Sequence, residues 1–196
     1  MINKTFLKKI STDLKSFQKE RGFIINRSRD ILQASKEAIF ATHRLDNKIA
    51  LESINRAETI LKELSKNYDK GNRLRFEGSY KAAVEEYVEA KLFMKLMDGE
   101  KIDAIKFGNI GPEEYIGGMA DVTGELVRQA VLQSTKNEFG NIKKYHSVTE
   151  EIVGFMLNLY MTGHSRQKFD EVKRNLKRLE GILYDIKIRE LDGKNN

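Results

Sequence analysis

Apolar residues recur at spacings of three and four along nearly the whole chain, which is the pattern of one face of an α-helix. No stretch shows the alternation of apolar and polar residues that is typical of a half-buried strand. Pro112, followed by Glu113 and Glu114, marks one helix start, because proline suits the first helical position and acids suit the positive end. The pattern predicts about seven helices, over residues 6–17, 24–39, 54–64, 83–97, 112–130, 152–159 and 169–186.

The chain is therefore expected to be all-α, with antiparallel helices in a single domain over residues 1–196. Neither an internal repeat nor a low-complexity linker marks a boundary. Glycines are expected to end three of the helices, near Gly71, Gly99 and Gly163. The segment 169–186 alternates spacings of three and four like a heptad seam, which fits packing on the domain core or a contact between subunits.

Composition narrows the class of protein. The chain contains no cysteine, so disulfides, zinc–thiolate sites and thiol chemistry are excluded. The amphipathic N-terminus lacks the continuous apolar core of a signal peptide, and no later run is as long as a membrane span. These features predict a cytoplasmic protein that does not cross a membrane.

Positive charge is concentrated in the first part of the chain. Residues 1–76 carry 17 Lys and Arg against 9 Asp and Glu, whereas residues 77–196 carry 18 against 20. This asymmetry indicates an anionic partner, with nucleic acid ahead of an anionic membrane. A solvated helical surface is the alternative explanation of the same counts.

Four acids flank the apolar stripes of two successive helices. Glu86 and Glu89 are three residues apart, and Asp121 and Glu125 are four apart, so each pair projects from one helix face. If a short connection makes the two helices antiparallel, the four carboxylates can meet at a partly shielded site, where a divalent metal relieves their repulsion. Oxygen ligands favour Mg²⁺ or Mn²⁺ over zinc. Acid pairs at this spacing are also common on solvated faces.

Other residues near the acids have ordinary explanations. Glu85 and Lys91 indicate that the helix over 83–97 also has a solvated side. Gly117 and Gly118 fit close helix packing, or room for a ligand, better than a phosphate cradle. The chain has no Glu-x-x-His pair of the di-iron bundles, no GxxxxGK[ST] loop and no GxSxG elbow.

Four ordered segments carry a resemblance to a known family. Residues 28–44 (SRDILQASKEAIFATHR) resemble the signature of the translin/TRAX family, TRAX being translin-associated factor X. Residues 86–90 (EYVEA) resemble a stretch typical of the TRAX branch, and residues 115–126 (YIGGMADVTGEL) resemble its DYLLGVADLTGEL stretch. Residues 176–189 (LKRLEGILYDIKIR) resemble the last helix of the family. The resemblance covers nearly the full chain.

The resemblance implies an all-α superhelical bundle of about seven helices, assembled into closed octameric shells that bind single-stranded RNA and DNA. In the TRAX branch it also implies cleavage of RNA with Mg²⁺. The catalytic and metal-binding acids of that branch match Glu86, Glu89 and Asp121, with Glu125 as the expected additional member, whereas translin lacks this set. The resemblance therefore predicts a Mg²⁺-dependent endoribonuclease for single-stranded RNA in a homo-oligomer, an octamer by family likeness. The alternative is a translin-type binder of single-stranded RNA or DNA that does not cut.

Basic residues along the chain are candidates for contact with nucleic acid, and for each of them a solvated surface is the alternative. Three lie along one helix at spacings of seven and eight, two belong to the segment 75–81 (RFEGSYK), which resembles a nucleic-acid-binding stretch of translin, and one follows the acids. They are Arg29, Lys36, Arg44, Arg75, Lys81 and Arg128. The segment 75–81 departs from the family at Glu77 and Ser79, where histidines are expected.

Two residues near the acids keep alternative roles. Arg128 fits either an ion pair with a carboxylate or a contact with the scissile phosphate. His43 fits a packed or hydrogen-bonded histidine better than a metal ligand. Two further classes of protein remain as rivals, a helical nucleotide pyrophosphatase, which also binds Mg²⁺ through helix-borne acids, and a structural helical protein without a ligand.

Overall fold

The computed structural model describes residues 2–106 and 110–192, and within these ranges the chain forms helices and connecting segments without a strand. The elements are α1 (Lys4–His43), α2 (Asn47–Tyr68), the 3₁₀-helix η1 (Lys70–Phe76), α3 (Gly78–Met97), α4 (Pro112–Thr135), α5 (Ile142–Leu157) and α6 (Gly163–Asp192). The predictions of an all-α fold and of about seven helices are confirmed.

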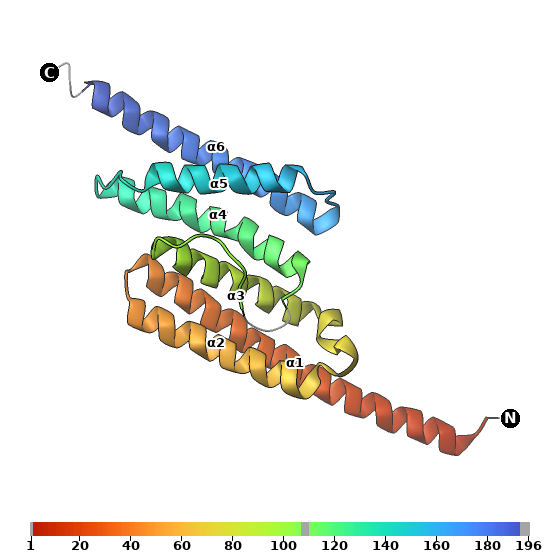
Figure 1. Ribbon diagram of the computed structural model, residues 1–196. Coiled ribbons are helices and arrows are strands. Elements are labelled where there is room, and N and C mark those ends of the chain that lie inside the picture. The colour runs from red at the N-terminus through yellow and green to blue at the C-terminus, as the bar shows by residue number, and fades with distance from the viewer. Residues whose placement is uncertain (1, 107–109, 193–196) are drawn as a thin grey trace.

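α1 is one continuous helix of 40 residues, so the prediction of separate helices over 6–17 and 24–39 is wrong. The residues between them, QKERGF, are mostly helix formers, and a single glycine costs a helix only about 1 kcal/mol. The N-terminal part of α1 projects from the other helices (Figure 1) and leaves its apolar stripe exposed. The stripe residues are Phe6, Ile10, Leu14 and Phe17, each 45–57% exposed.

The prediction that Gly163 ends a helix is also wrong, since α5 ends at Leu157 and Gly163 is the first residue of α6. Gly163 has a φ of 53°, and Gly99, directly after the C-cap of α3, has a φ of 83°. Positive φ at glycine occurs on either border of a helix, so the residue type alone does not say which helix it bounds. The prediction for Gly99 is confirmed.

The helices are arranged in a row in which α1 packs against α2 and α3, α3 against α4, and α4 against α5 and α6 (Figure 1). α2 and α5 run opposite to their sequence neighbours, as short connections between helices require. α3 lies in the middle of the row, and its Tyr87 and Phe93 are fully buried. The middle of the row therefore supplies much of the apolar core.

α3 and α4 run in the same direction, so the expectation that this pair is antiparallel is wrong. Lys81, near the start of α3, forms an ion pair of 2.7 Å with Glu113, near the start of α4. α4 begins at the same end of the row as α3, so the connection over residues 98–111 joins opposite ends of the two helices (Figure 1). A 20-residue helix spans about 30 Å, and this connection can extend over about 45 Å, so it is long enough to do so.

α3 and α4 approach each other closely at Gly118. A Cβ atom at this position would lie 2.6 Å from the carbonyl oxygen of Glu85, 2.7 Å from Cβ of Val88 and 2.8 Å from the backbone nitrogen of Glu89. Only a residue without a side chain leaves room for the two backbones. The interpretation of this glycine as a helix-packing position is confirmed, and the contact lies beside one of the predicted catalytic acids.

The heptad seam of α6 packs on the domain core. Phe169, Val172 and Leu179 are buried, so the first half of the seam packs on the domain core. The second half of α6 projects beyond α5 (Figure 1), where Ile188 is 39% and Leu191 is 46% exposed. Leu183 and Ile186 of the seam are partly buried against the same core, so the core-packing interpretation is confirmed for the seam, and the exposed residues 188 and 191 lie beyond it.

We expect Gly118→Ala to lower the free energy of unfolding by about 1–3 kcal/mol, because the added methyl group forces α3 and α4 apart. The measurement is urea unfolding followed by circular dichroism. Gly181→Ala in α6 is the matched control, since no atom lies within 4 Å of its added Cβ, and it should raise stability by about 0.5–1 kcal/mol. Equal stability of Gly118→Ala and the unchanged protein would contradict the close contact.

Candidate metal and nucleic-acid site

An open pocket of about 640 Å³ lies where α1, α3 and α4 meet. Three of the four predicted acids line it, together with two of the predicted nucleic-acid contacts. The residues in question are Glu86, Glu89, Glu125, Lys36 and Arg128. The structure therefore brings the acids and two cations into one pocket, although residues 36 and 128 are far apart in sequence.

Glu89 is the acid most removed from water. The residue is 8% exposed, and its carboxyl forms no hydrogen bond or ion pair with another of the described residues. Burial raises the pKa of its carboxyl to about 9, and the nearby carboxylates of Asp121, Glu86 and Glu125 add to the effect. A buried carboxyl without a partner is costly to ionise, so this environment favours its protonated form.

Glu86 lies one turn before Glu89 on α3 and is half-buried. Burial raises its pKa, the positive charge of Lys36 opposes the increase, and the charges of Asp121 and Glu125 add to it. Lys36 is therefore close enough to the acids to act on their ionisation. Like Glu89, Glu86 makes no hydrogen bond or ion pair with the described residues.

Glu125 differs from the other acids because it has partners. Its carboxylate hydrogen bonds to Nε2 of His43, whose Nδ1 lies 2.8 Å from Oε1 of Gln129. Arg128 lies 3.5 Å away on the next turn. Burial works to raise the pKa of Glu125, but the hydrogen bond and charge of His43, with the help of Arg128, outweigh it and lower the pKa.

His43 is held on all sides. Its side chain is 3% exposed, and its ring lies against Phe93 with 4.6 Å between the ring centroids. The interpretation of His43 as a packed, hydrogen-bonded histidine is confirmed. The ion pair of Arg128 with Glu125 likewise agrees with one of the two roles expected for that arginine.

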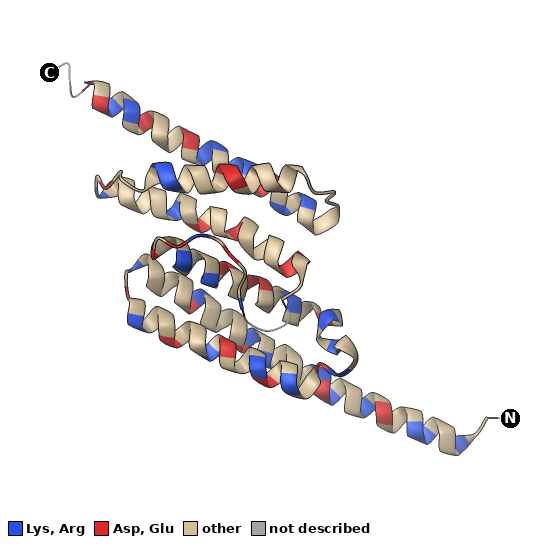
Figure 2. Cartoon of the chain, viewed as in Figure 1, with Lys and Arg blue, Asp and Glu red and all other residues tan. Residues whose placement is uncertain are grey.

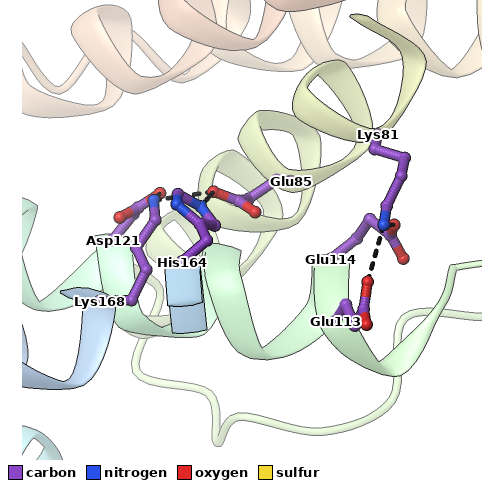
Figure 3. A network of polar contacts seen from close by, with 7 residues as sticks. All are labelled: Lys81, Glu85, Glu113, Glu114, Asp121, His164 and Lys168. Carbon is purple, nitrogen blue, oxygen red and sulfur yellow. Dashed lines mark hydrogen bonds and ion pairs between the residues drawn. The ribbon is translucent and has the colours of Figure 1, made fainter. Parts of the chain in front are cut away.

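Asp121 turns away from this pocket. Its carboxylate accepts a hydrogen bond from the ammonium of Lys168 on α6, and the same ammonium lies 2.7 Å from Glu85 on α3 (Figure 3). Burial raises the pKa of Asp121, whereas Lys168 opposes that increase. Glu85 is mostly shielded, so its assignment to a solvated side of α3 is wrong.

Lys168 is the residue of the site that the sequence analysis missed. Its position directly before the buried Phe169 was the available signal, since a lysine at the margin of a packed seam can reach into a helix interface. The side chain is 15% exposed. Hydrogen bonds to Asp121 and Glu85 outweigh the cost of burying its charge and raise its pKa.

The donor set of the pocket suits a hard divalent cation. Among the described residues, no group of three or more His, Asp or Glu side chains is arranged to hold a metal ion, because Asp121 pairs with Lys168 and Glu125 pairs with His43. The buried, unpartnered carboxyl of Glu89 nevertheless fits such an ion, since a buried carboxylate needs a positive partner. Glu86 offers a second carboxyl group on the same helix face.

The other predicted nucleic-acid contacts lie apart from the acids. Arg29 is exposed on α1, and Arg44, exposed directly after α1, stacks over Phe40, 4.5 Å from the ring centroid. Arg75 and Lys81 line a separate pocket of about 320 Å³. Residues of both charge signs occur along the helices (Figure 2), so the excess positive charge forms no single stripe in this view.

Lys81 already forms ion pairs with two acids. Its ammonium lies 2.7 Å from Glu113 and 3.5 Å from Glu114 at the start of α4 (Figure 3). These ion pairs tie the start of α3 to the start of α4. A contact between Lys81 and a phosphate would have to replace them.

The fold and the site together define a class of protein. It is an all-α protein with a cluster of carboxylates in a pocket flanked by positively charged side chains. Two solved structures, named apo-NeC3PO and AfC3PO, match this chain with TM-scores of 0.82, at 19% and 20% identity. Each match covers 94% of this chain and 97% or 98% of the other. A complex of AfC3PO with duplex RNA matches with a TM-score of 0.80, at 20% identity, over 94% of this chain and 98% of that one.

Residues 19–190 match the translin family, and the chain belongs to that family. An uncharacterized protein of Methanocaldococcus jannaschii is 28% identical over 183 residues, which cover 87% of this chain and 79% of that protein. Translin of Gallus gallus is 28% identical over 81 residues, or 41% of this chain and 35% of the relative. In the described ranges, no helix is both long and apolar enough to span a membrane.

We expect Glu89→Gln to stabilise the protein in EDTA, by about 2 kcal/mol or more at pH 9 and by less at pH 5. Folded Glu89 keeps its proton up to a pH of about 9, whereas the unfolded chain loses it near 4.5. Between these values the folded state binds more protons, so this carboxyl lowers stability as the pH rises. Urea unfolding at several pH values measures the difference.

Glu113→Gln is the matched control. Hydrogen bonding to Lys81 lowers the pKa of Glu113, so its carboxylate adds stability that is present above its unfolded pKa and is lost as the pH falls. This variant should therefore be slightly less stable than the unchanged protein at pH 9. A constant stability gain of Glu89→Gln across the pH range would contradict the protonated state of the buried carboxyl.

Proposed function

We propose that this chain is a TRAX-like, Mg²⁺-dependent endoribonuclease that acts on single-stranded RNA as a homo-oligomer, with the octamer as its expected size. The observation that carries the proposal is the buried, unpartnered carboxyl of Glu89 in a pocket flanked by Lys36 and Arg128. A buried acid without a partner is unfavourable for folding, which is typical of a group retained for chemistry. The placement of the chain in the TRAX branch rests on these acids.

The residues proposed to hold the metal are Glu86, Glu89, Asp121 and Glu125. A bound Mg²⁺, or Mn²⁺ in its place, supplies positive charge for the carboxylates and polarises the phosphodiester. For Glu89, such an ion would be the positive partner that its buried carboxylate lacks. Asp121 pairs with Lys168, so its carboxylate would have to leave that ion pair to join the other three.

The remaining residues of the pocket have roles that follow from their charges. Lys36 and Arg128 line the pocket beside the acids and would contact phosphate oxygens of the RNA. Glu125, whose pKa His43 and Arg128 keep low, is ionised at neutral pH and accepts the proton of the attacking water. The water oxygen bonds to phosphorus as the bond from phosphorus to O3′ breaks, and O3′ takes a proton from solvent. The products are a 3′-hydroxyl and a 5′-phosphate.

Self-association of the chain has support in its exposed apolar surface. The projecting part of α1 exposes Phe6, Ile10, Leu14 and Phe17, and the projecting end of α6 exposes Leu191. Apolar stripes of this length on a polar chain are typical of contacts between subunits. A cytoplasmic location, which the absence of cysteine favours, completes the proposal.

The alternative function is binding of single-stranded RNA or DNA without cleavage. One matched structure is a complex with duplex RNA, so duplex RNA is a further ligand to include beside single strands. Metal-dependent turnover separates the nuclease from the binder. Hydrolysis of free nucleoside triphosphates would instead favour the pyrophosphatase.

We expect the unchanged protein to cut a labelled single-stranded RNA with Mg²⁺ and to leave it intact in EDTA. Glu89→Gln should reduce the rate by at least about 100-fold, because the amide cannot supply a negative ligand, and should retain RNA binding. Glu150→Gln, on the exposed surface of α5, is the charge-matched control and should cut normally. Binding without cutting by the unchanged protein would favour the translin-type binder.

We expect Lys36→Ala and Arg128→Ala each to weaken binding of single-stranded RNA and to lower the slope of log affinity against log salt by about 0.7. Each side chain is proposed to neutralise one phosphate, and that contact releases a counterion. Fluorescence anisotropy over a range of salt concentrations measures the slope. Lys143→Ala, on the exposed face of α5, should leave it unchanged, and an unchanged slope in both pocket variants would remove the phosphate role.

A further inference from the structure

Lys168 lies between two acids on two different helices. Its ammonium contacts the carboxylates of Asp121 on α4 and Glu85 on α3, and His164 lies 3.6 Å from Glu85 (Figure 3). The side chains of Lys168, Glu85 and Asp121 are 15–24% exposed. This network therefore joins α6 to both helices that carry the candidate catalytic acids.

The network divides the candidate acids into two groups. Glu86, Glu89 and Glu125 line the pocket, whereas Asp121 does not, because its carboxylate is directed toward Lys168. Asp121 nevertheless remains close enough to raise the pKa of Glu89 through its charge. The residue is therefore beside the pocket, and the contact with Lys168 decides which way its carboxylate points.

Glu85 makes it feasible for the carboxylate of Asp121 to leave the ammonium of Lys168. A shielded ammonium that loses its carboxylate partner is costly, because the remaining charge is uncompensated. Glu85 lies 2.7 Å from Lys168, so the ammonium keeps one partner after Asp121 has turned into the pocket. Without Glu85, Asp121 would be the sole carboxylate in contact with Lys168 among the described residues.

We infer that Lys168 is a positioning residue that holds Asp121 in the metal-free protein and competes with the divalent cation for its carboxylate, and that Glu85 weakens this hold by sharing the ammonium. The inference rests on the proposed function, since it assigns Asp121 to the metal. Lys168 acts through Asp121 and touches neither the RNA nor the metal. The competition sets the metal concentration at which the site fills.

Substitutions at Lys168 and at Glu85 should shift the Mn²⁺ dissociation constant in opposite directions. Lys168→Met removes the competitor, so the Mn²⁺ dissociation constant should fall by about five-fold or more. Glu85→Gln leaves Lys168 with Asp121 alone, so the constant should rise by a similar factor. Lys168→Arg keeps the charge and should stay near the unchanged protein. In the double variant that combines Lys168→Met with Glu85→Gln, the second substitution should no longer change the dissociation constant. The ammonium through which Glu85 acts is absent from that variant.

The experiment is Mn²⁺ binding by the full chain, measured by electron paramagnetic resonance or calorimetry without RNA. Lys173→Met removes a charge from the exposed side of α6, and Glu171→Gln removes an acid that acts on Asp121 through its charge without contacting Lys168. Both control variants should change the constant by less than two-fold. Circular dichroism and thermal unfolding of each variant identify any that does not fold.

The outcomes separate the inference from the proposed function. Opposite shifts in Lys168→Met and Glu85→Gln, with loss of the second shift in the double variant, support the inference. Mn²⁺ uptake by the unchanged protein with no shift in these variants, or with equal shifts in the control variants, overturns it and leaves the proposed metal site intact. Failure of the unchanged protein to take up Mn²⁺ overturns both. If Lys168→Met does not fold, a raised Mn²⁺ dissociation constant in Glu85→Gln, with Lys168→Arg unchanged, still supports the inference, and an unchanged constant in Glu85→Gln overturns it.

Discussion

The close approach of α3 and α4 at Gly118 is the constraint on which the rest of the site depends. Because the two backbones nearly touch, the backbone nitrogen of Glu89 lies 2.8 Å from the place where a Cβ of residue 118 would be. The carboxyl of Glu89 is thereby enclosed and set beside the carboxylates of Asp121 and Glu125. One missing side chain thus brings acids of two helices together, and the cost appears as a raised pKa.

Side chains from two other helices pair with some of these acids and offset part of their negative charge. α1 supplies His43, which binds Glu125, and α6 supplies Lys168, which binds Asp121. Glu89 is left without such a partner among the described residues. The acids therefore differ in pKa although they are close together: the pKa of Glu125 is lowered and that of Glu89 is raised. Groups whose pKa values are separated in this way can take different roles in binding and proton transfer.

Local sequence patterns were enough to predict the class of fold and the helix positions of the four acids. Spacings of three and four show which residues face the core, so α2, α3, α4 and α6, and the positions of Glu86, Glu89, Asp121 and Glu125, could be predicted, whereas η1 and the first ten residues of α5 were missed. The signature segments determined the family. These properties depend on neighbours within a few residues, and the sequence records such neighbours explicitly.

The tertiary structure alone decided how the elements meet. A regular helix pattern does not reveal whether two segments are continuous, so α1 was expected as two helices, and the length of residues 98–111 was not enough to fix the direction of α4. The partnership of Lys168 with Glu85 and Asp121 likewise joins three helices. Local periodicity gives the face on which a side chain lies, whereas its partner depends on packing between distant segments, which no local pattern contains.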